Sequence, residues 1–456
     1  MQTAPITTVN SWRQEAVAML RVAGPLIVNN LAIAGMQFAD AVMAGRLGAK
    51  SLASVAVGAS VWFLGFTLML GLMMAISPIA ARHFGAGNPG LIGRYTRHGL
   101  WLALVLGLSL YVLAKQFAGP ALTSIGVDAG FRDTTVAYVH AIMLGAPAIC
   151  GFLAFRFTTE GIGHTRPIMY TSIFALVSNV FLNWVLMFGN LGAPALGAVG
   201  AGYASAITMW LIFFMLGAYL WLHPYYKPLD IFTRFYRLRP EVIREIVALG
   251  WPISITITAE AGLFGAVSIL MGTRGAEITA AHQVALNFAS TMFMVPLAVS
   301  SATTIRIGHA LGAARIRAAR FSGIVGITLC GAFMAASATF LLVFRDAVVN
   351  LYTNDPAVQQ IAISLLLMAA AFQIADGVQV GAAGALRGYK DTRVPMAINM
   401  IAYWVLAFPL AYMAAVVWVS PASYVWGGFV VGLSVAAVLL SLRYNRVSKA
   451  PLCAQL

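Results

Sequence analysis

Charge is the scarcest property of this 456-residue sequence: only 9% of its residues are Asp, Glu, Lys or Arg, whereas 61% are hydrophobic. Soluble domains carry roughly 25% charged residues, and a surface that faces water cannot be made from so few. The mean hydropathy is +0.86. The stretches that lack charge are long enough to cross a bilayer, so the sequence indicates a polytopic membrane protein without a separate soluble domain.

Cysteine is also scarce, and so are the motifs of cofactor chemistry. Cys150, Cys330 and Cys453 lack the spacing of a metal site, and their odd number argues against a disulfide framework. No phosphate-binding loop occurs, so ATP is not expected as the energy source. The N-terminus has no short apolar segment with a cleavage site, so we expect the first span to be retained. We expect no cofactor.

Twelve apolar segments are each long enough for a membrane-spanning helix of roughly 20 residues. They lie near residues 19–45, 53–77, 98–118, 136–157, 168–190, 196–222, 247–272, 279–303, 321–344, 361–386, 395–417 and 423–442. This pattern predicts an all-α polytopic membrane protein with twelve transmembrane helices.

The cations are divided unevenly between the segments that connect these spans. If the N-terminus lies inside, 22 of the 28 Lys and Arg residues fall inside and 6 fall outside. The positive-inside rule predicts such a split. We therefore attribute the net charge of +14 to topology rather than to nucleic-acid binding, and we expect both termini in the cytoplasm.

An internal duplication appears when the sequence is compared with itself at an offset of 227 residues. Pro25 then falls on Pro252, and the same offset matches glycines in three separated regions. Each half holds six spans, so the halves have the same orientation. The prediction is two six-helix bundles, 1–222 and 247–456, joined by a cytoplasmic linker at 223–246 and related by a pseudo-two-fold axis along the membrane normal.

Three of the fourteen acidic residues lie inside predicted spans: Asp40 in the first, Glu260 in the seventh and Asp376 in the tenth. An acidic side chain at the centre of a bilayer costs about 2.5–3.5 kcal/mol by insertion scales and marks function by default. No span carries Lys or Arg at comparable depth. We expect these acids to be protonated or neutralised by a proton, a metal cation or a cationic substrate.

Amide side chains add oxygen atoms near the acids. Gln373 and Gln379 lie three residues before and after Asp376, and Asn179 and Asn183 form an i, i+4 pair in the fifth span. Such residues also join helices by hydrogen bonds. Carboxyl and amide oxygens together suit Na⁺ or a proton, and competition with a cationic substrate would couple their movements.

At these residues the sequence resembles the multidrug and toxic compound extrusion (MATE) transporters of the bacterial NorM type, over essentially the whole chain. The resemblance is carried by QFADAVMAGRLGA (37–49), WPISITITAE (251–260), AHQVALN (281–287) and IADGVQVGAAGALRGYKDTRVP (374–395). It implies two six-helix bundles and cation-driven efflux across the bacterial inner membrane. The resemblance thus implies a transporter rather than an enzyme; we expect it to be a monomer that handles small organic cations within the lipid bilayer.

The resemblance also assigns roles by position. It implies cation coupling by Glu260, Asp376, Asp40, Asn179 and Asn183. We expect Glu260 and Asp376 to form a Na⁺ site. We expect substrate contacts from Asp40, Asp355, Gln283, Met292 and Phe293. Phe372 departs from the pattern, because some relatives have a tyrosine near the cation at this place.

Two other functions compete with drug export. A lipid-linked oligosaccharide flippase of the same superfamily is the alternative transporter, but its pyrophosphate would favour Arg or Lys in the spans, which here carry acids. An intramembrane aspartyl protease would show a GxGD pattern, whereas Asp40 follows Phe-Ala and Asp376 follows Ile-Ala. We predict an antiporter that exports organic, mostly cationic compounds in exchange for Na⁺ or H⁺, with the ion left open.

Overall fold

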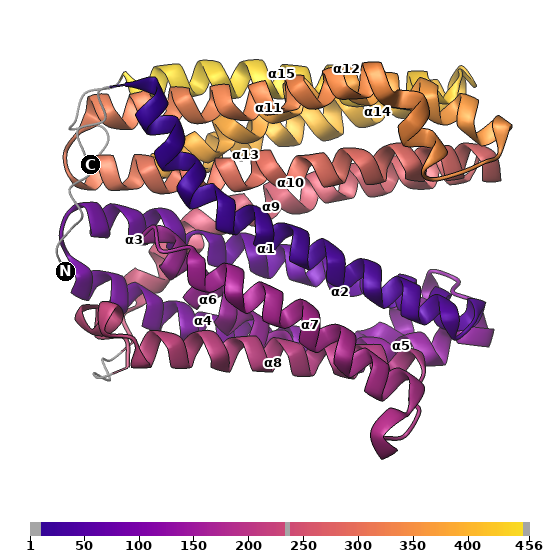
Figure 1. The fold of residues 1–456 in the computed structure, drawn as a ribbon, viewed down its shortest axis with the longest axis horizontal. Helices are drawn as coiled ribbons and strands as arrows, with labels where there is room; N and C mark the ends of the chain where they lie inside the picture. Colours follow the sequence, from indigo (N-terminus) through magenta and orange to yellow (C-terminus); the bar gives the residue numbers. More distant parts are fainter. Residues whose placement is uncertain (1–10, 233–237, 450–456) are drawn as a thin grey trace. The chain divides into compact units, whose positions relative to one another are not determined.

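The structure is a computed structural model that describes residues 11–232 and 238–449, and long helices fill most of them (Figure 1). The α-helices are α1 (Trp12–Arg46), α2 (Ala49–Met74), α3 (Ile76–Gly85), α4 (Pro89–Ser124), α5 (Ala129–Met143), α6 (Ala146–Gly161), α7 (Arg166–Phe188), α8 (Ala198–Leu222), α9 (Pro240–Gly272), α10 (Ala276–Gly312), α11 (Ile316–Asn350), α12 (Pro356–Gly388), α13 (Arg393–Met400), α14 (Phe408–Tyr412) and α15 (Ala422–Ser448). Two short 3₁₀ segments, η1 (Asn190–Gly192) and η2 (Pro224–Leu229), and two π-helical segments, η3 (Ile401–Ala407) and η4 (Met413–Val417), complete the elements. The part of the predicted linker at 233–237 and Cys453 lie outside the described residues.

The predicted count of twelve spans is confirmed. Among the described residues, eleven helical segments are long and apolar enough to cross a membrane, and the pair α5 and α6, bent by 42°, makes the twelfth. The second span is also broken, into α2 and α3 at Ala75. The longest helix, α10, has 37 residues. At 1.5 Å per residue it measures roughly 55 Å, so it extends beyond a hydrocarbon core of about 30 Å.

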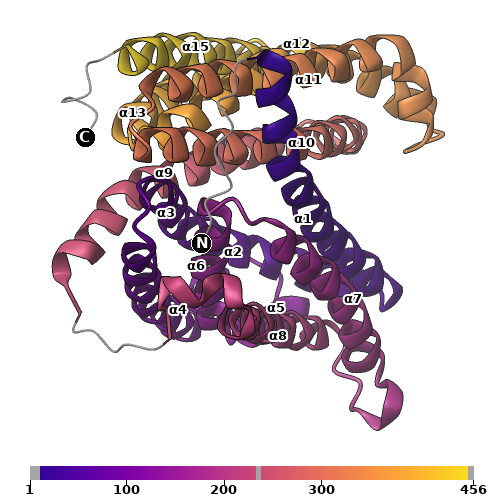
Figure 2. The ribbon, with the colours of Figure 1, turned by 60° about the vertical axis from the view of Figure 1, so that its left-hand side comes forward.

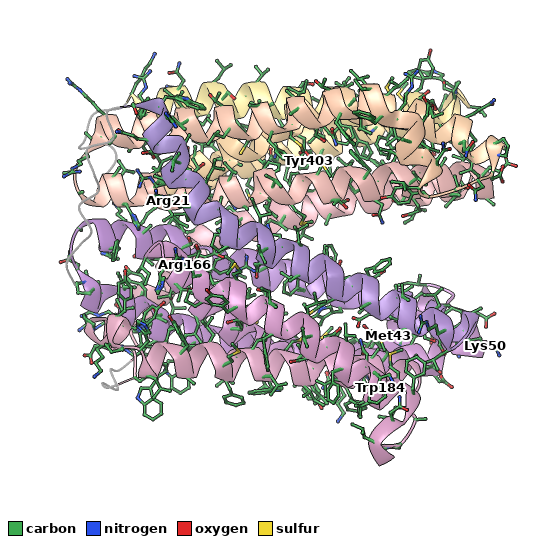
Figure 3. All side chains as sticks on the ribbon, in the orientation of Figure 1. Arg21, Met43, Lys50, Arg166, Trp184 and Tyr403 are labelled. Carbon is green, nitrogen blue, oxygen red and sulfur yellow. The ribbon has the colours of Figure 1, made fainter. Side chains whose placement is uncertain are left out.

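The helices form two compact units, each with its own apolar core. Unit 1 contains residues 25–254, and unit 2 contains residues 11–24 together with 255–449. Within unit 2, α10, α11, α12 and α15 run side by side (Figure 2). Helix α1 begins and α15 ends at the same end of this unit, as an even number of spans requires (Figure 1). In unit 1, Lys50 and Arg166 lie toward opposite ends of the helices (Figure 3).

The units differ from the predicted bundles because the first helix of each repeat is divided between them. The division falls next to Pro25 in α1 and two residues after Pro252 in α9, the two prolines that the internal repeat matches. The beginning of α1 therefore belongs to unit 2, and the beginning of α9 belongs to unit 1. The predicted boundaries assign these segments the other way round.

A buried ion pair fixes the beginning of α1 within unit 2. Glu15 is 1% exposed, and its Oε1 accepts hydrogen bonds from Arg306 Nε at 2.8 Å and from Ser322 Oγ at 2.6 Å. Met19, one turn further along the helix, is fully buried and packs near Val325 of α11. A carboxylate without water needs such partners, so this contact specifies where the segment docks.

The beginning of α9 packs in unit 1 through close backbone contact. A Cβ added at Gly71 of α2 would lie 2.3 Å from Ser254 Cα, and one added at Gly250 would lie 2.5 Å from the carbonyl oxygen of Leu72. Glycine is needed at both places because no side chain fits between the helices. On the same segment, the Glu245 carboxylate accepts a hydrogen bond from Tyr95 of α4.

The described part of the linker also packs on unit 1. Leu229 of η2 is fully buried, and the Tyr226 hydroxyl is hydrogen-bonded to Nδ1 of His164, in the connection between α6 and α7, at 2.7 Å. The main-chain nitrogen of Arg239 donates to Nε2 of His98 at 2.9 Å. The connection between the repeats is therefore attached to unit 1 by several polar contacts.

Candidate functional site

The polar cluster of unit 2 joins three spans through one tyrosine. Tyr403 lies in the interior of the unit with its side chain fully buried (Figure 3). Its hydroxyl accepts a hydrogen bond from Gln379 Nε2 of α12 at 2.8 Å and donates one to Glu260 Oε2 of α9 at 3.5 Å. The predicted residue Glu260 is thus held beside α12, where Asp376 lies one turn from Gln379.

Asp376 completes this cluster, and part of its oxygen surface is unpaired. The side chain is 4% exposed, and its carboxyl is close enough to that of Glu260 for the two to interact electrostatically. Within the described residues, Asp376 Oδ1 and Gln379 Oε1 have no hydrogen-bond partner. On the other side, Ser337 Oγ donates to Gln373 Oε1 at 3.2 Å. The structure therefore brings together Glu260 and Asp376, as predicted, with unpaired oxygen atoms beside them.

The local backbone explains how these side chains are presented. The face of α12 that carries Gly377 and Gly384 touches its neighbours so closely that a Cβ would lie 2.7 Å from the Cys330 carbonyl oxygen or 2.2 Å from Ser300 Oγ. This contact fixes the rotation of α12 and with it the direction of its polar residues. Tyr403 lies in the π-helical segment η3, a rare helix form that is frequent at functional sites.

The polar cluster of unit 1 joins α1, α7 and α8. Asn183 Nδ2 donates to Asp40 Oδ1 at 2.5 Å and lies 3.2 Å from Asn179 Oδ1, while Asn179 Nδ2 donates to Ser205 Oγ at 3.3 Å. The structure therefore brings together the three predicted residues of the N-terminal half. Asn183 Oδ1 is the atom of this cluster that lacks a partner among the described residues.

Two tyrosines beside the acids were not predicted from the sequence. Tyr138 of α5 is 1% exposed and lies close enough to Asp40 to interact with its charge, and Tyr403 stands in the same relation to Glu260. A signal was present for Tyr403, because Tyr in membrane proteins is enriched at the interfaces and this residue lies well inside a predicted span, whereas Tyr138 lies near the start of the span predicted at 136–157. Tyr403 thus brings a phenol to the cluster from a different helix than the one that carries Phe372. Phe372 itself packs on Trp426 and Phe429 at ring distances of 5.7 and 6.0 Å.

Four other predicted residues make no hydrogen bond or ring contact with these clusters in the part of the chain that the structure describes. Gln283 is exposed on α10, Phe293 is half-buried, and Met292 packs against the core of unit 2. Asp355 is exposed, and its Oδ1 accepts a hydrogen bond from the Ala357 main chain at 2.9 Å, so it caps the start of α12. Substrate binding by these residues stays a prediction.

The donor atoms of the unit 2 cluster are all oxygen. Within residues 11–232 and 238–449, no group of three or more His, Cys, Asp and Glu side chains could hold a metal ion. The unit 2 cluster consists of two carboxyl groups, an amide oxygen and a phenol, so all of its donor atoms are oxygen.

Comparison with known proteins identifies the family. The family model described as MatE matches residues 25–185 and again residues 252–413. This chain belongs to the MATE family. The two matches begin at Pro25 and Pro252, so they confirm the internal duplication read from the sequence.

Curated relatives match this MATE protein along almost its full length. The multidrug resistance protein PmpM of Pseudomonas aeruginosa is 37% identical, and the alignment covers 96% of this chain and 92% of the relative. The multidrug resistance protein NorM of Vibrio vulnificus is 36% identical over 96% of both chains. The similarity supports a drug efflux transporter of the bacterial NorM type.

Solved structures confirm the fold of this MATE transporter. The eukaryotic MATE transporter AtDTX14 superposes with a TM-score of 0.88 at 21% identity, covering 97% of this chain and 98% of that one. A crystal structure of MATE in complex with MaD3S superposes with a TM-score of 0.87 at 21% identity, covering 96% and 97%. At this identity the likeness establishes the helical architecture alone.

Proposed function

We propose that this transporter exports organic, mostly cationic compounds across the bacterial inner membrane in exchange for Na⁺ or H⁺, with Glu260 and Asp376 as the coupling site. The observation that carries the proposal is the unit 2 cluster, where the buried carboxyl group of Asp376 lies near the half-buried Glu260, which is joined through Tyr403 to Gln379. A carboxyl group buried as deeply as that of Asp376 requires a proton or a cation.

The unpaired atoms favour unit 2 over unit 1 as the coupling site. Within the described residues, both Asp376 Oδ1 and Gln379 Oε1 lack hydrogen-bond partners, whereas in unit 1 the carboxyl group of Asp40 accepts a short hydrogen bond and one amide oxygen, Asn183 Oδ1, is unpaired. A cation that enters the unit 2 cluster gains oxygen ligands without first breaking existing hydrogen bonds. We assign Asp40, Asn179 and Asn183 to a supporting polar site in the N-terminal half.

The nature of the substrate follows from the charge inside the spans. Both clusters contain carboxyl groups, which attract a cationic compound and repel the pyrophosphate of a lipid-linked oligosaccharide. The relatives named multidrug resistance proteins point in the same direction. We further propose that the protein works as a monomer with both termini in the cytoplasm.

The test uses purified protein in liposomes preloaded with a fluorescent organic cation. A Na⁺ gradient and a pH gradient are imposed separately on the wild type, Glu260→Gln and Asp376→Asn. The matched control is Glu277→Gln, which removes an exposed carboxylate from the first turn of the neighbouring helix α10.

We expect one of the two gradients to drive efflux in the wild type and the control, and neither gradient to drive it in the two variants. Efflux that survives in both variants would exclude unit 2 as the coupling site. Wild-type protein that moves the dye under neither gradient would contradict the proposed function itself.

A further inference from the structure

Unit 2 contains a series of buried polar atoms without hydrogen-bond partners in the part of the chain that the structure describes. The series starts at Thr392, the N-cap residue of α13, and continues inward to the coupling site. Its members are Thr392 Oγ1, both amide atoms of Asn399, Gln379 Oε1 and Asp376 Oδ1. The side chains are all at least nine-tenths buried, and Asn399 is fully buried.

The positions of these residues give the series a direction. Asn399 follows Thr392 by seven residues and precedes Tyr403 by four, so all three lie close to one face of the same span. At 1.5 Å per residue, Asn399 lies roughly 10 Å inside Thr392 and roughly 6 Å before Tyr403. Tyr403 is bonded to Gln379 and Glu260. The series of polar atoms therefore runs from the loop between α12 and α13 to the coupling cluster.

The equivalent place in unit 1 is closed by a hydrogen bond. The offset of 227 residues places Ser172 opposite Asn399, and Ser172 Oγ is bonded to the side-chain amide of Asn29 at 2.6 Å. Thr165, opposite Thr392, is also engaged in an interaction. Unit 2 thus has an open amide at the place where the same scaffold in unit 1 has a satisfied pair.

A fully buried amide with both of its polar atoms unpaired is rare in proteins, and such groups are ordinarily satisfied by ordered water with two to four polar partners. We propose that Asn399 binds water and forms the middle of a hydrated path from the α12–α13 connection to Glu260 and Asp376. The use of this path by the coupling cation rests on the proposed function.

The path solves a problem that the coupling cluster creates. A cation that leaves the buried carboxyl group of Asp376 toward the α12–α13 connection passes roughly 16 Å along this span, and without polar partners this step is strongly unfavourable. Water held by Asn399 rehydrates the cation on the way. The outer end of the path carries Lys390 and Arg393, whose charge lowers the local concentration of cations. This end therefore favours release of the cation over its return.

Hydroxyl-radical footprinting tests the hydration directly, because radicals produced by X-rays from bound water modify the side chains next to it. The reporter is Tyr403 and the internal reference is Trp426, which is equally buried in unit 2 but has its indole N–H bonded to His282 at 3.0 Å. We expect Tyr403 in the wild-type protein to be modified faster than Trp426. Equal rates in the wild type would overturn the proposal without need of any variant.

Variants then locate the water. In Asn399→Leu, which keeps the volume but removes both polar atoms, we expect the modification rate of Tyr403 to fall to that of Trp426. We also expect dye export to slow about tenfold, as for the loss of one buried hydrogen-bonding group. Asn399→Ser, which restores a hydroxyl like that of unit 1, should recover part of both signals. The control Met400→Leu should change neither.

The two assays separate the two proposals. A footprint on Tyr403 that depends on Asn399 supports the water path even if no gradient drives export, and in that case only the proposed function fails. A footprint that is unchanged in Asn399→Leu contradicts the assignment of water to Asn399, whatever the transport assay shows.

Discussion

Units 1 and 2 share a helical scaffold but carry their polar groups at different places. The offset of 227 residues sets Asp40 opposite Val267 and Glu260 opposite Ile33, so the acid on the first helix of each repeat is matched by an apolar residue in the other. The prolines that begin the repeats coincide. The two repeats thus share the prolines that begin them, whereas each repeat carries its acidic residue at a different position of its first helix.

The backbone of the two units differs where the chemistry differs. Helix α7 of unit 1 is a regular α-helix, whereas the equivalent span of unit 2 contains η3 and η4. Tyr403 lies in η3, and its counterpart in α7 is Leu176. A π-helical turn inserts a residue and rotates the rest of the helix, so it can aim one side chain without moving the whole span. In unit 2, therefore, a π-helical segment carries one residue of the polar cluster.

The largest expected difference between the units concerns their acids. Asp376→Asn should lower gradient-driven export roughly 100-fold, as expected for breaking a buried charged group's interactions at about 3 kcal/mol. Asp40→Asn should lower it only a few-fold, because its amide partners in unit 1 remain. Initial efflux rates from liposomes measure both. Equal losses would show that the two clusters share the coupling role.

The next effect concerns stability and the segment of α1 that docks in unit 2. Glu15→Gln leaves Arg306 buried without its charge partner, and breaking such a pair costs about 3–5 kcal/mol. Asp391→Asn, which breaks the more exposed pair with Arg443 at 2.7 Å, should cost about 1 kcal/mol or less. Thermal unfolding of the detergent-purified variants compares them. A smaller loss for Glu15→Gln than for Asp391→Asn would mean that α1 docks in another way.

The two tyrosines provide a smaller and more specific comparison. Tyr403→Phe removes the hydroxyl that joins Gln379 to Glu260, so the concentration of coupling cation at half-maximal export should rise roughly tenfold. Tyr138→Phe in unit 1 should change it less than about twofold. Titrating export against the cation in both variants decides the matter. A larger shift for Tyr138→Phe would reverse the assignment of the units.

The smallest effect is a pH dependence confined to unit 1. Burial, together with the nearby His223 and Arg166, holds the pKa of His164 below its ordinary value of 6.5. The unfolded chain therefore binds more protons than the folded one just below that value, so stability should fall as the pH drops through about 6.5. Melting temperatures at about pH 8 and pH 5.5 measure this loss, which His164→Gln should reduce. In unit 2 the equivalent position is Asp391 rather than a histidine. A loss of stability at low pH that is unchanged in His164→Gln would show that another group causes it.

Much of this architecture was predictable from the sequence because it depends on local composition. The apolar runs gave twelve spans, the 227-residue offset gave the repeat, and the rarity of acids in spans singled out Asp40, Glu260 and Asp376. These signals depend on the cost of placing polar groups in lipid, which is read one segment at a time.

The remaining features depend on contacts between distant segments. The docking of Glu15 on Arg306 joins residues 291 positions apart, and Tyr403 reaches Glu260 across 143 positions. Hydropathy carries no information about such pairs. The π-helical geometry of η3 was equally hidden, because its residues are as apolar as those of a regular span.

The division of α1 has a consequence for the way the chain is made. The beginning of α1 is synthesised first, but Arg306 and Ser322, which bind its Glu15, are synthesised roughly 300 residues later. At a rate of about 5–20 residues per second, this segment waits at least 15 seconds for its partners. Neither repeat is therefore a complete folding unit, and a chain that stops after the first six spans would leave the docking face of Met19 uncovered.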